Sequence, residues 1–169
     1  GYVWMGTNTS VERFDGIRLE HYMVEGSNEN LKRVFALVEM PGNELWVGTG
    51  MGLFRLADDA EKLERLAPEM ITSGVHAFCK LGDVLYVGTE KGLYVYKGGV
   101  FEHVLVDKNI FSRANFVTGM VEGENGILWL STMGGLKSLR LSDQSITSFS
   151  DKLAKNGQNL SFYNITRIG

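Results

Sequence analysis

A phrase of thirteen residues recurs along the chain at a nearly constant interval, and this repetition constrains the fold more than any other feature. Its three clear copies are ELWVGTGMGLFRL (44–56), VLYVGTEKGLYVY (84–96) and ILWLSTMGGLKSL (127–139), and a weaker copy is YVWMGTNTSVERF (2–14). The aromatic residues at the third position of these copies are Trp4, Trp46, Tyr86 and Trp129. They are 42, 40 and 43 residues apart. A period of about 40–45 residues is typical of four-stranded β-propeller blades.

The apolar runs inside each copy are too short for helices and have the length of strands. The 169 residues include 21 Gly but only 2 Pro, with 9 Phe, 6 Tyr and 3 Trp. Many short aromatic strands separated by glycine turns predict an all-β protein. Each clear repeat is interpreted as four strands: 33–39, 44–49, 52–56 and a weak strand near 61–66; then 75–81, 84–89, 92–97 and 100–106; then 116–122, 127–132, 135–141 and 145–150. Residues 61–70 also fit an amphipathic helix, because Leu63, Leu66 and Met70 share one helical face, and this alternative stays open.

The predicted architecture is a set of β-propeller blades of four antiparallel strands, about four blades' worth in one segment. The blade boundaries are predicted near 1–30, 31–73, 74–114 and 115–160, with the start of a further blade at 161–169. The first unit lacks an inner strand, and the last residues resemble one. We therefore favour an arc of a larger propeller over a ring closed by four blades.

The repeated residues are assigned to packing. The aromatic residue of each copy is expected to be a buried wedge between neighbouring blades. Gly48 and Gly88 are expected to allow a close approach of strands or of the next blade, with Ser131 as the small substitute in the fourth copy. The threonines that follow, Thr49, Thr89 and Thr132, belong to the same structural repeat.

Composition and motifs argue against several classes of function. The net charge of −3 with mixed signs gives no basic surface for nucleic acid or an anionic membrane. No apolar run has the length of a membrane span, and no signal sequence is visible. His21, His76 and His103 are isolated and Cys79 is alone, so we expect no metal, no cofactor and no catalytic residue, and hence no enzymatic activity in this segment.

Ligand contact is expected on the face that carries the loops between blades, because loops on a rigid scaffold commonly carry binding sites. The candidate ligand-binding residues are Arg33, Lys91, Arg113 and Asn115, which are polar and do not belong to the repeat. Guanidinium and amide groups suit the hydroxyls of a sugar, or the carboxylate or sulfate of an acidic sugar. The alternative is that these four side chains are simply solvated.

The clear copies resemble the repeat of two-component regulator propellers, whose frame G-x-L-W-x-[GS]-T-x-x-G-L is filled here by residues 126–136. The resemblance covers nearly the whole chain, but the first copy departs from it, with Ser10-Val11 in place of Gly-Leu. It implies a seven-bladed propeller in the periplasmic sensor region of a hybrid two-component histidine kinase. In that arrangement propellers precede an immunoglobulin-like domain, a membrane helix and cytoplasmic kinase modules.

The resemblance further implies a sensor that binds oligosaccharides, acts through a homodimer of the parent protein and controls transcription. No kinase motif is present in the segment itself. Three alternatives remain at this stage: a protein–protein scaffold without a small ligand, a sensor coupled to another output such as a diguanylate cyclase, and a propeller enzyme such as a lyase or glycosidase. Fold alone does not separate them.

Overall fold

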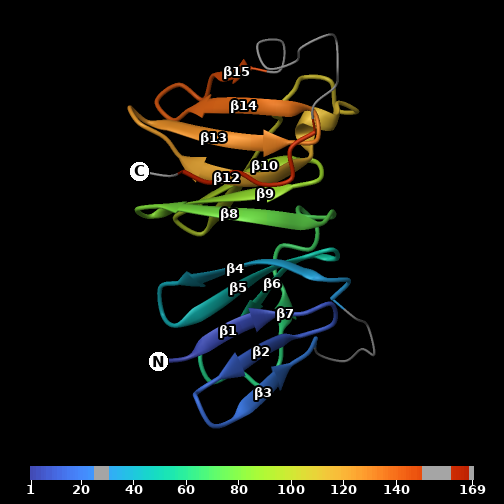
Figure 1. Cartoon of the computed structure of the whole chain (residues 1–169), viewed down its shortest axis with the longest axis vertical. Coiled ribbons are helices and arrows are strands. Elements are labelled where there is room, and N and C mark those ends of the chain that lie inside the picture. Colours follow the sequence, from blue (N-terminus) through green and yellow to red (C-terminus); the bar gives the residue numbers. More distant parts are fainter. Residues whose placement is uncertain (25–30, 150–160, 168–169) are drawn as a thin grey trace. The chain divides into compact units, whose positions relative to one another are not determined.

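The repeated phrase forms a β-hairpin in every copy, and each hairpin belongs to one of four antiparallel sheets (Figure 1). The computed structural model describes residues 1–24, 31–149 and 161–167. The chain divides into two compact units, residues 1–75 and 76–169, and the division falls inside a strand, after its first residue. Each unit is described below by itself.

The first unit contains a three-stranded and a four-stranded sheet, each in sequence order. The strands of the first sheet are β1 (Val3–Gly6), β2 (Val11–Phe14) and β3 (Leu19–Tyr22); those of the second are β4 (Val34–Met40), β5 (Glu44–Thr49), β6 (Gly52–Leu56) and β7 (Glu64–Arg65). Apolar side chains of both sheets form one core, which comprises Val11, Tyr22, Leu31, Leu45, Val47, Phe54, Leu56 and Leu63. No helix forms over residues 61–70, so the strand interpretation was right, although the outer strand is only two residues long.

The second unit contains two four-stranded sheets. Their strands are β8 (Val75–Leu81), β9 (Val84–Thr89), β10 (Gly92–Lys97) and β11 (Val100–Val104), then β12 (Val117–Glu122), β13 (Ile127–Thr132), β14 (Gly135–Arg140) and β15 (Ile146–Ser148). A 3₁₀ turn, η1 (Arg113–Asn115), precedes β12 and is the one helical element among the described residues. The core of this unit joins Tyr86, Leu93 and Val106 to Val117, Leu128, Leu130 and Leu139. The prediction of an all-β chain built from four-stranded antiparallel sheets is thus confirmed, with one three-stranded sheet at the start.

The threonine of each phrase closes the hairpin between its two strands. Thr49, Thr89 and Thr132 are fully buried. Each hydroxyl donates to the carbonyl oxygen three residues later, at 3.0, 2.8 and 2.6 Å, and accepts the backbone N–H two residues later, at 3.0, 3.1 and 3.1 Å. The half-buried Thr7 of the first copy makes the same two bonds, to the Ser10 carbonyl and from the Thr9 N–H, both at 3.1 Å. The phrase therefore repeats because each hairpin needs this internal hydrogen-bonding group.

The glycine before the threonine lies against the first valine of the following sheet. A β-carbon at Gly48 would lie 2.8 Å from Val75 Cγ1, and one at Gly88 would lie 2.8 Å from Val117 Cγ1. Such distances are too short for a real β-carbon, so a larger residue at either glycine would displace the neighbouring valine. This agrees with the close approach that the sequence predicts.

The aromatic residues of the phrase differ in burial. Trp46 and Tyr86 are 3 % and 9 % exposed, and Tyr86 contacts the core of the following sheet, as a wedge should. Trp4 and Trp129 are partly buried, so they are less enclosed than the aromatic residues of the other two copies. The indole of Trp129 packs on Phe149, which follows β15, with ring centroids 5.0 Å apart. Trp129 also lines a cavity of about 520 Å³.

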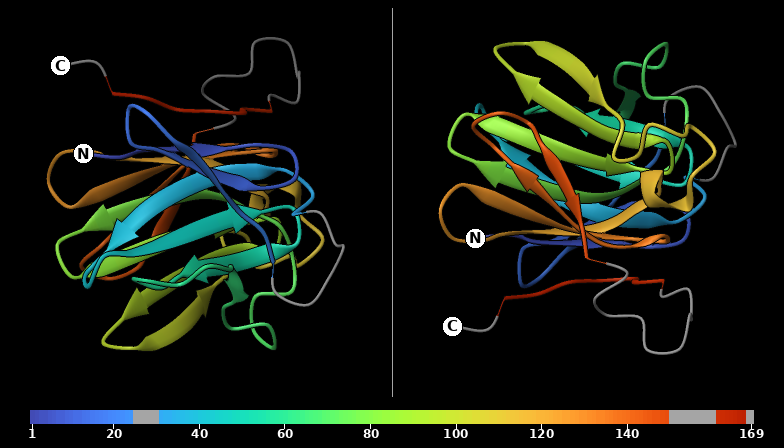
Figure 2. Two further views of the ribbon diagram at one scale, coloured as in Figure 1. Left: turned by 90° about the horizontal axis from the view of Figure 1, so that it is seen from below. Right: turned by 90° about the horizontal axis from the view of Figure 1, so that it is seen from above.

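Residues 161–167 run as an extended segment beside β12, without a strand assignment (Figures 1 and 2). The Phe162 N–H donates to the Thr132 carbonyl at 3.0 Å, as the Val34 N–H donates to the Thr7 carbonyl at 2.8 Å. The segment thus begins as β4 begins after the first sheet. A further blade at 161–169 stays a prediction, and the predicted loop at 151–160 lies outside the described residues.

Candidate functional site

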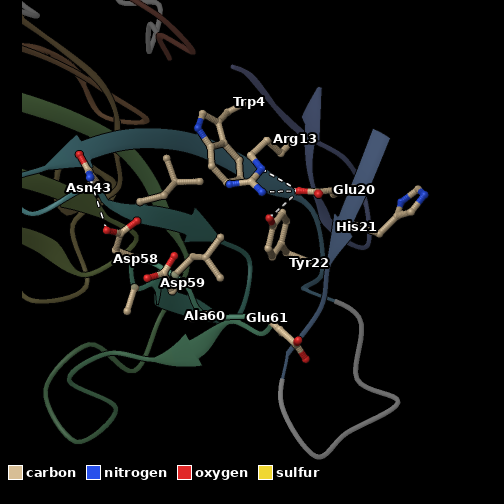
Figure 3. Close-up of a pocket in the computed structure, with 13 residues that line it drawn as sticks. Trp4, Arg13, Glu20, His21, Tyr22, Asn43, Asp58, Asp59, Ala60 and Glu61 are labelled. Atoms are coloured by element: carbon tan, nitrogen blue, oxygen red, sulfur yellow. Dashed lines mark hydrogen bonds and ion pairs between the residues drawn. The ribbon is translucent and has the colours of Figure 1, made fainter. Parts of the chain in front are cut away.

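A cavity of about 420 Å³ lies between the two sheets of the first unit (Figure 3). This volume is within the range of about 300–1,000 Å³ that is usual for small-molecule sites. The lining residues come from β1 to β3 on one side and from the β4–β5 turn, β5, the end of β6 and the β6–β7 connection on the other. They are Trp4, Arg13, Glu20, His21, Tyr22, Asn43, Leu45, Leu56, Ala57, Asp58, Asp59, Ala60 and Glu61.

The wall from the first sheet is a row of side chains brought together by strand register. Trp4 pairs with Arg13 across β1 and β2, and Arg13 pairs with Glu20 across β2 and β3, so the three share one face of the sheet. Arg13 donates to Glu20 Oε2 from Nε at 2.8 Å, and the Tyr22 hydroxyl donates to the same oxygen at 2.9 Å. The guanidinium carbon lies 5.6 Å from the ring centroids of both Trp4 and Tyr22.

This hydrogen-bonded row fixes the charges in the wall. The hydrogen bond from Arg13, and then that from Tyr22, lowers the pKa of the Glu20 carboxyl, while the bond to Glu20 raises the pKa of Arg13. Burial, followed by the bond to Glu20, raises the pKa of Tyr22. Glu20 is therefore a fixed carboxylate, and Arg13 is a cation held by its neighbours.

The opposite wall is acidic and belongs to two turns of the second sheet. Asn43 and Asp59 adopt positive φ values of 59° and 61°, which asparagine and aspartate tolerate better than most residues. The Asn43 side chain donates to Asp58 Oδ2 at 3.4 Å across the two turns. Asp58, Asp59 and Glu61 are exposed, whereas the floor is formed by the buried side chains of Leu45 and Leu56.

The charge around the cavity is therefore negative. Four carboxylates line it, those of Glu20, Asp58, Asp59 and Glu61, against the single guanidinium of Arg13. His21 also belongs to the lining, but its imidazole points away from the hollow and pairs with Glu12 (Figure 3). An aromatic wall, hydrogen-bonding groups and an apolar floor together suit a small polar ligand that carries no negative charge.

The four residues predicted from sequence lie outside this cavity. Arg33 and Lys91 are exposed: Arg33 directly precedes β4, and Lys91 lies in the β9–β10 turn. The Arg33 guanidinium lies over the Phe35 ring at 5.4 Å, and its backbone N–H donates to the Asn8 carbonyl at 2.9 Å. Arg33 belongs to the first unit and the other three to the second, where Arg113 is exposed and donates to Ser161 Oγ at 3.3 Å.

Asn115 has a different environment from the one expected of a ligand-binding residue. Its side chain is 1 % exposed, donates to the carbonyls of Asp107 and Asn109 at 3.1 and 2.9 Å, and accepts the Asp107 N–H at 2.9 Å. These bonds use the amide to hold the loop after β11, and they leave it no open side for a ligand. The same loop displays Ile110 and Phe111, which are 64 % and 88 % exposed.

The histidines of the second unit, His76 and His103, contact neighbouring groups. His76 lies 3.2 Å from Glu90 Oε1, with its ring 4.7 Å from that of Phe116, and His103 Nε2 lies 2.9 Å from the Lys91 carbonyl oxygen. Burial raises the pKa of the Cys79 thiol. Within residues 1–24, 31–149 and 161–167, no three His, Cys, Asp or Glu side chains are placed to hold a metal ion. None of the helical structure described in these ranges is long and apolar enough to cross a membrane.

Sequence reasoning did not select the cavity residues, although a signal was present. Arg13 follows Trp4 by nine residues, and Arg55 follows Trp46 by nine residues. This spacing places the two side chains of each pair opposite one another on neighbouring strands. A Trp–Arg–Glu row therefore occurs in both sheets of the first unit, as Trp4–Arg13–Glu20 and as Trp46–Arg55–Glu64.

No protein-family model matches the chain, and a search of curated proteins found no match. Solved structures do match it. The extracellular domain of BT4673 from B. thetaiotaomicron, described as a one-component system, aligns with a TM-score of 0.78 and 21% identity over 96% of this chain and 22% of its own. The extracellular domain of the hybrid two-component system BT3049 from the same organism aligns with a TM-score of 0.72 and 22% identity over 88% and 23%. An ancestral GH74 enzyme aligns with a TM-score of 0.66 and 18% identity over 86% and 22%.

These likenesses show the fold. The chain has the repeated antiparallel sheets of these extracellular domains, as the prediction of propeller blades requires. It spans about a fifth of the length of each of the three structures.

Proposed function

We propose that the chain is a ligand-sensing segment of a periplasmic sensor region, in a hybrid two-component histidine kinase that controls transcription. The ligand is a polar molecule, an oligosaccharide, and the parent sensor acts as a homodimer. The observation that carries this proposal is the structural likeness to extracellular domains of one-component and two-component systems, which extends over 96% of the chain in the case of BT4673. The cavity of the first unit adds a place where a small polar ligand fits.

The segment itself binds and does not catalyse in this proposal. The GH74 structure shows that the fold also occurs in an enzyme, so the carboxylates need a separate argument. A glycosidase needs a general acid whose pKa is raised by its surroundings. Hydrogen bonds lower the pKa of four described carboxyls, so these four do not meet that requirement: Asp15, Glu20, Asp107 and Asp143.

One observation favours the alternative of a protein–protein scaffold. Ile110 and Phe111 are exposed side by side on a loop held by the hydrogen bonds of Asn115, and exposed aromatic residues are common in protein interfaces. The two functions differ in what binds: a scaffold needs a protein partner, whereas the proposed sensor binds an oligosaccharide without one.

The test is titration calorimetry of the full-length protein against a broad oligosaccharide panel that includes neutral, amino and acidic sugars. Saturable binding of at least one oligosaccharide is expected. The variants Arg33→Ala and Arg113→Ala, with their folding checked by circular dichroism, examine the loop residues predicted from sequence. Absence of binding to every sugar, together with capture of a protein partner that the double variant Ile110→Ala/Phe111→Ala loses, would favour the scaffold instead.

A further inference from the structure

We infer that the cavity of the first unit is a sugar subsite that prefers an amino sugar to a neutral one and a neutral sugar to an acidic one. This inference rests on the proposed function, because it names the class of oligosaccharide that the sensor takes. It differs from the sequence-based expectation, which placed sugar hydroxyls, or the carboxylate or sulfate of an acidic sugar, on four residues of the loop face: Arg33, Lys91, Arg113 and Asn115.

The walls of the cavity suit a single sugar ring. Trp4 is half-buried and faces the hollow, so part of its indole remains available to the apolar face of a pyranose. Trp4 is also rigid, because it packs on the core of the unit and lies 5.5 Å from the Tyr22 ring. A rigid aromatic side chain offers contact area at a low cost in conformational entropy.

The polar groups of the opposite wall suit hydroxyls and an ammonium group. Asp58, Asp59 and Glu61 are exposed carboxylates on two turns, and Asn43 adds an amide beside Asp58. Carboxylates accept hydrogen bonds from sugar hydroxyls and accept stronger ones from an ammonium group. The hydrogen bond between Asn43 and Asp58 holds these two side chains together, so this part of the wall needs less reorganisation when a ligand binds.

The charge balance decides the order of preference. Arg13 is the only cation of the lining, and it is already paired with Glu20 and packed beside three aromatic rings, those of Tyr2, Trp4 and Tyr22. The one cation that the lining places opposite the three carboxylates is Arg13, whose charge is matched by Glu20. A ligand carboxylate or sulfate would meet like charges there, whereas an ammonium group would meet opposite ones.

The experiment uses three tetrasaccharides with the same β-1,4 linkage: cellotetraose, its amino counterpart glucosamine tetraose, and its acidic counterpart cellotetrauronic acid. Their affinities for the full-length protein are measured by titration calorimetry at two salt concentrations. We expect the amino sugar to bind best and the acidic sugar to bind worst, with the difference shrinking at high salt because exposed charges are screened. Tightest binding of the acidic tetrasaccharide, or binding of none of the three, would overturn the inference.

Four variants, one of them a control, test whether the sugars bind in the cavity. Trp4→Ala should weaken binding of all three sugars about tenfold or more, and Trp4→Phe should recover most of the loss, because large aromatic side chains dominate such contacts. Asp59→Asn retains a residue that tolerates the positive φ and should lower the affinity for the amino sugar about two- to fivefold, as expected for one exposed charge pair. Asp83→Asn, in the β8–β9 turn of the second unit, makes the same change of net charge outside the lining and should leave all affinities unchanged.

The inference and the proposed function fail in different ways. If sugars of the broad panel bind but Trp4→Ala and Asp59→Asn leave every affinity unchanged, the cavity is not the subsite and the sensor proposal stands. If no oligosaccharide of either panel binds, both are overturned. Because Asp59 is exposed, its substitution tests the site even if Trp4→Ala does not fold.

Discussion

The threonine that closes each hairpin offers the most direct test of why the phrase repeats. Replacing Thr89 by valine keeps the shape of the side chain and removes its hydroxyl. The change deletes the 2.8 Å bond to the Gly92 carbonyl and the 3.1 Å bond from the Lys91 N–H. Thr89 is 0 % exposed, so water has no access to its hydroxyl position.

The expected cost follows from these two bonds. A typical intramolecular hydrogen bond contributes about 0.5–1.5 kcal/mol to stability, so Thr89→Val should lower the free energy of unfolding by about 1–3 kcal/mol. Thr49→Val and Thr132→Val should cost similar amounts, because their bonds have the same geometry and both residues are 0 % exposed. Thr7→Val should cost less for each hydrogen bond lost, because Thr7 is half-buried and water can replace part of what is lost. The Thr7 hydroxyl also accepts the Ser10 N–H and contacts the Ser10 hydroxyl, both at 3.0 Å, so its costs are compared per bond.

The assay is equilibrium unfolding in urea, followed by tryptophan fluorescence and by circular dichroism. Thr147→Val serves as the control, because Thr147 is exposed on β15 and such changes usually fall within about 0.5 kcal/mol. The reasoning is refuted if Thr89→Val unfolds like Thr147→Val. It is also refuted if each hydrogen bond lost in Thr7→Val costs as much as each one lost in the three buried replacements, since the cost would then not depend on burial.

Three further predictions concern packing. Gly88→Ala should destabilise the protein by about 1–3 kcal/mol in thermal unfolding, because its β-carbon would overlap Val117 Cγ1, and adding Val117→Ala should recover part of the loss; purely additive costs would contradict this. Trp46→Ala should cost about 3–5 kcal/mol, and Trp129→Ala clearly less, because Trp46 is 3 % exposed and Trp129 only half-buried; equal losses in urea unfolding would count against the assignment. Asn115→Ala should speed proteolysis of the loop after β11, because three hydrogen bonds are lost, and an unchanged cleavage rate would show that the amide does not hold it.

Sequence reasoning performed best where local pattern and packing agree. The bounds of β5, β6, β8, β9, β10 and β13 coincide with those predicted, because each is a short run rich in apolar residues with turn residues at one end or both. The outer strands were predicted less well. The predicted strand at 61–66 is reduced to Glu64 and Arg65 in β7. Its sequence does not alternate apolar and polar residues, and the residues on either side of β7 do not extend the strand.

The site was less predictable than the fold for two physical reasons. The burial of Asn115 depends on how the loop at 107–115 folds back on itself, which a polar composition does not reveal. The cavity depends on side chains of two different sheets that meet only in the folded unit. Residue types alone therefore favoured exposed arginines as ligand-binding residues. The arginine that lines the cavity is Arg13, which is hydrogen-bonded to Glu20.

The two Trp–Arg–Glu rows of the first unit separate a structural role from a binding role. In the second sheet, Arg55 pairs with Glu64. Trp46 is buried, and its Nε1 donates to Glu44 at 3.1 Å. This row therefore has a structural role. In the first sheet the same row faces the cavity, and Trp4 is half-buried.

The first copy of the phrase is also the one that departs from the repeat. Ser10 stands where the other copies have a glycine with positive φ, and its hydroxyl donates to Glu12 Oε1 at 2.6 Å. Trp4 and Trp129 are the two repeated aromatic residues that are half-buried and line a cavity, but only the cavity of Trp4 is lined by Asn43, Asp58 and Asp59. The variants that test sugar binding therefore belong at Trp4 rather than at Trp46, which is buried.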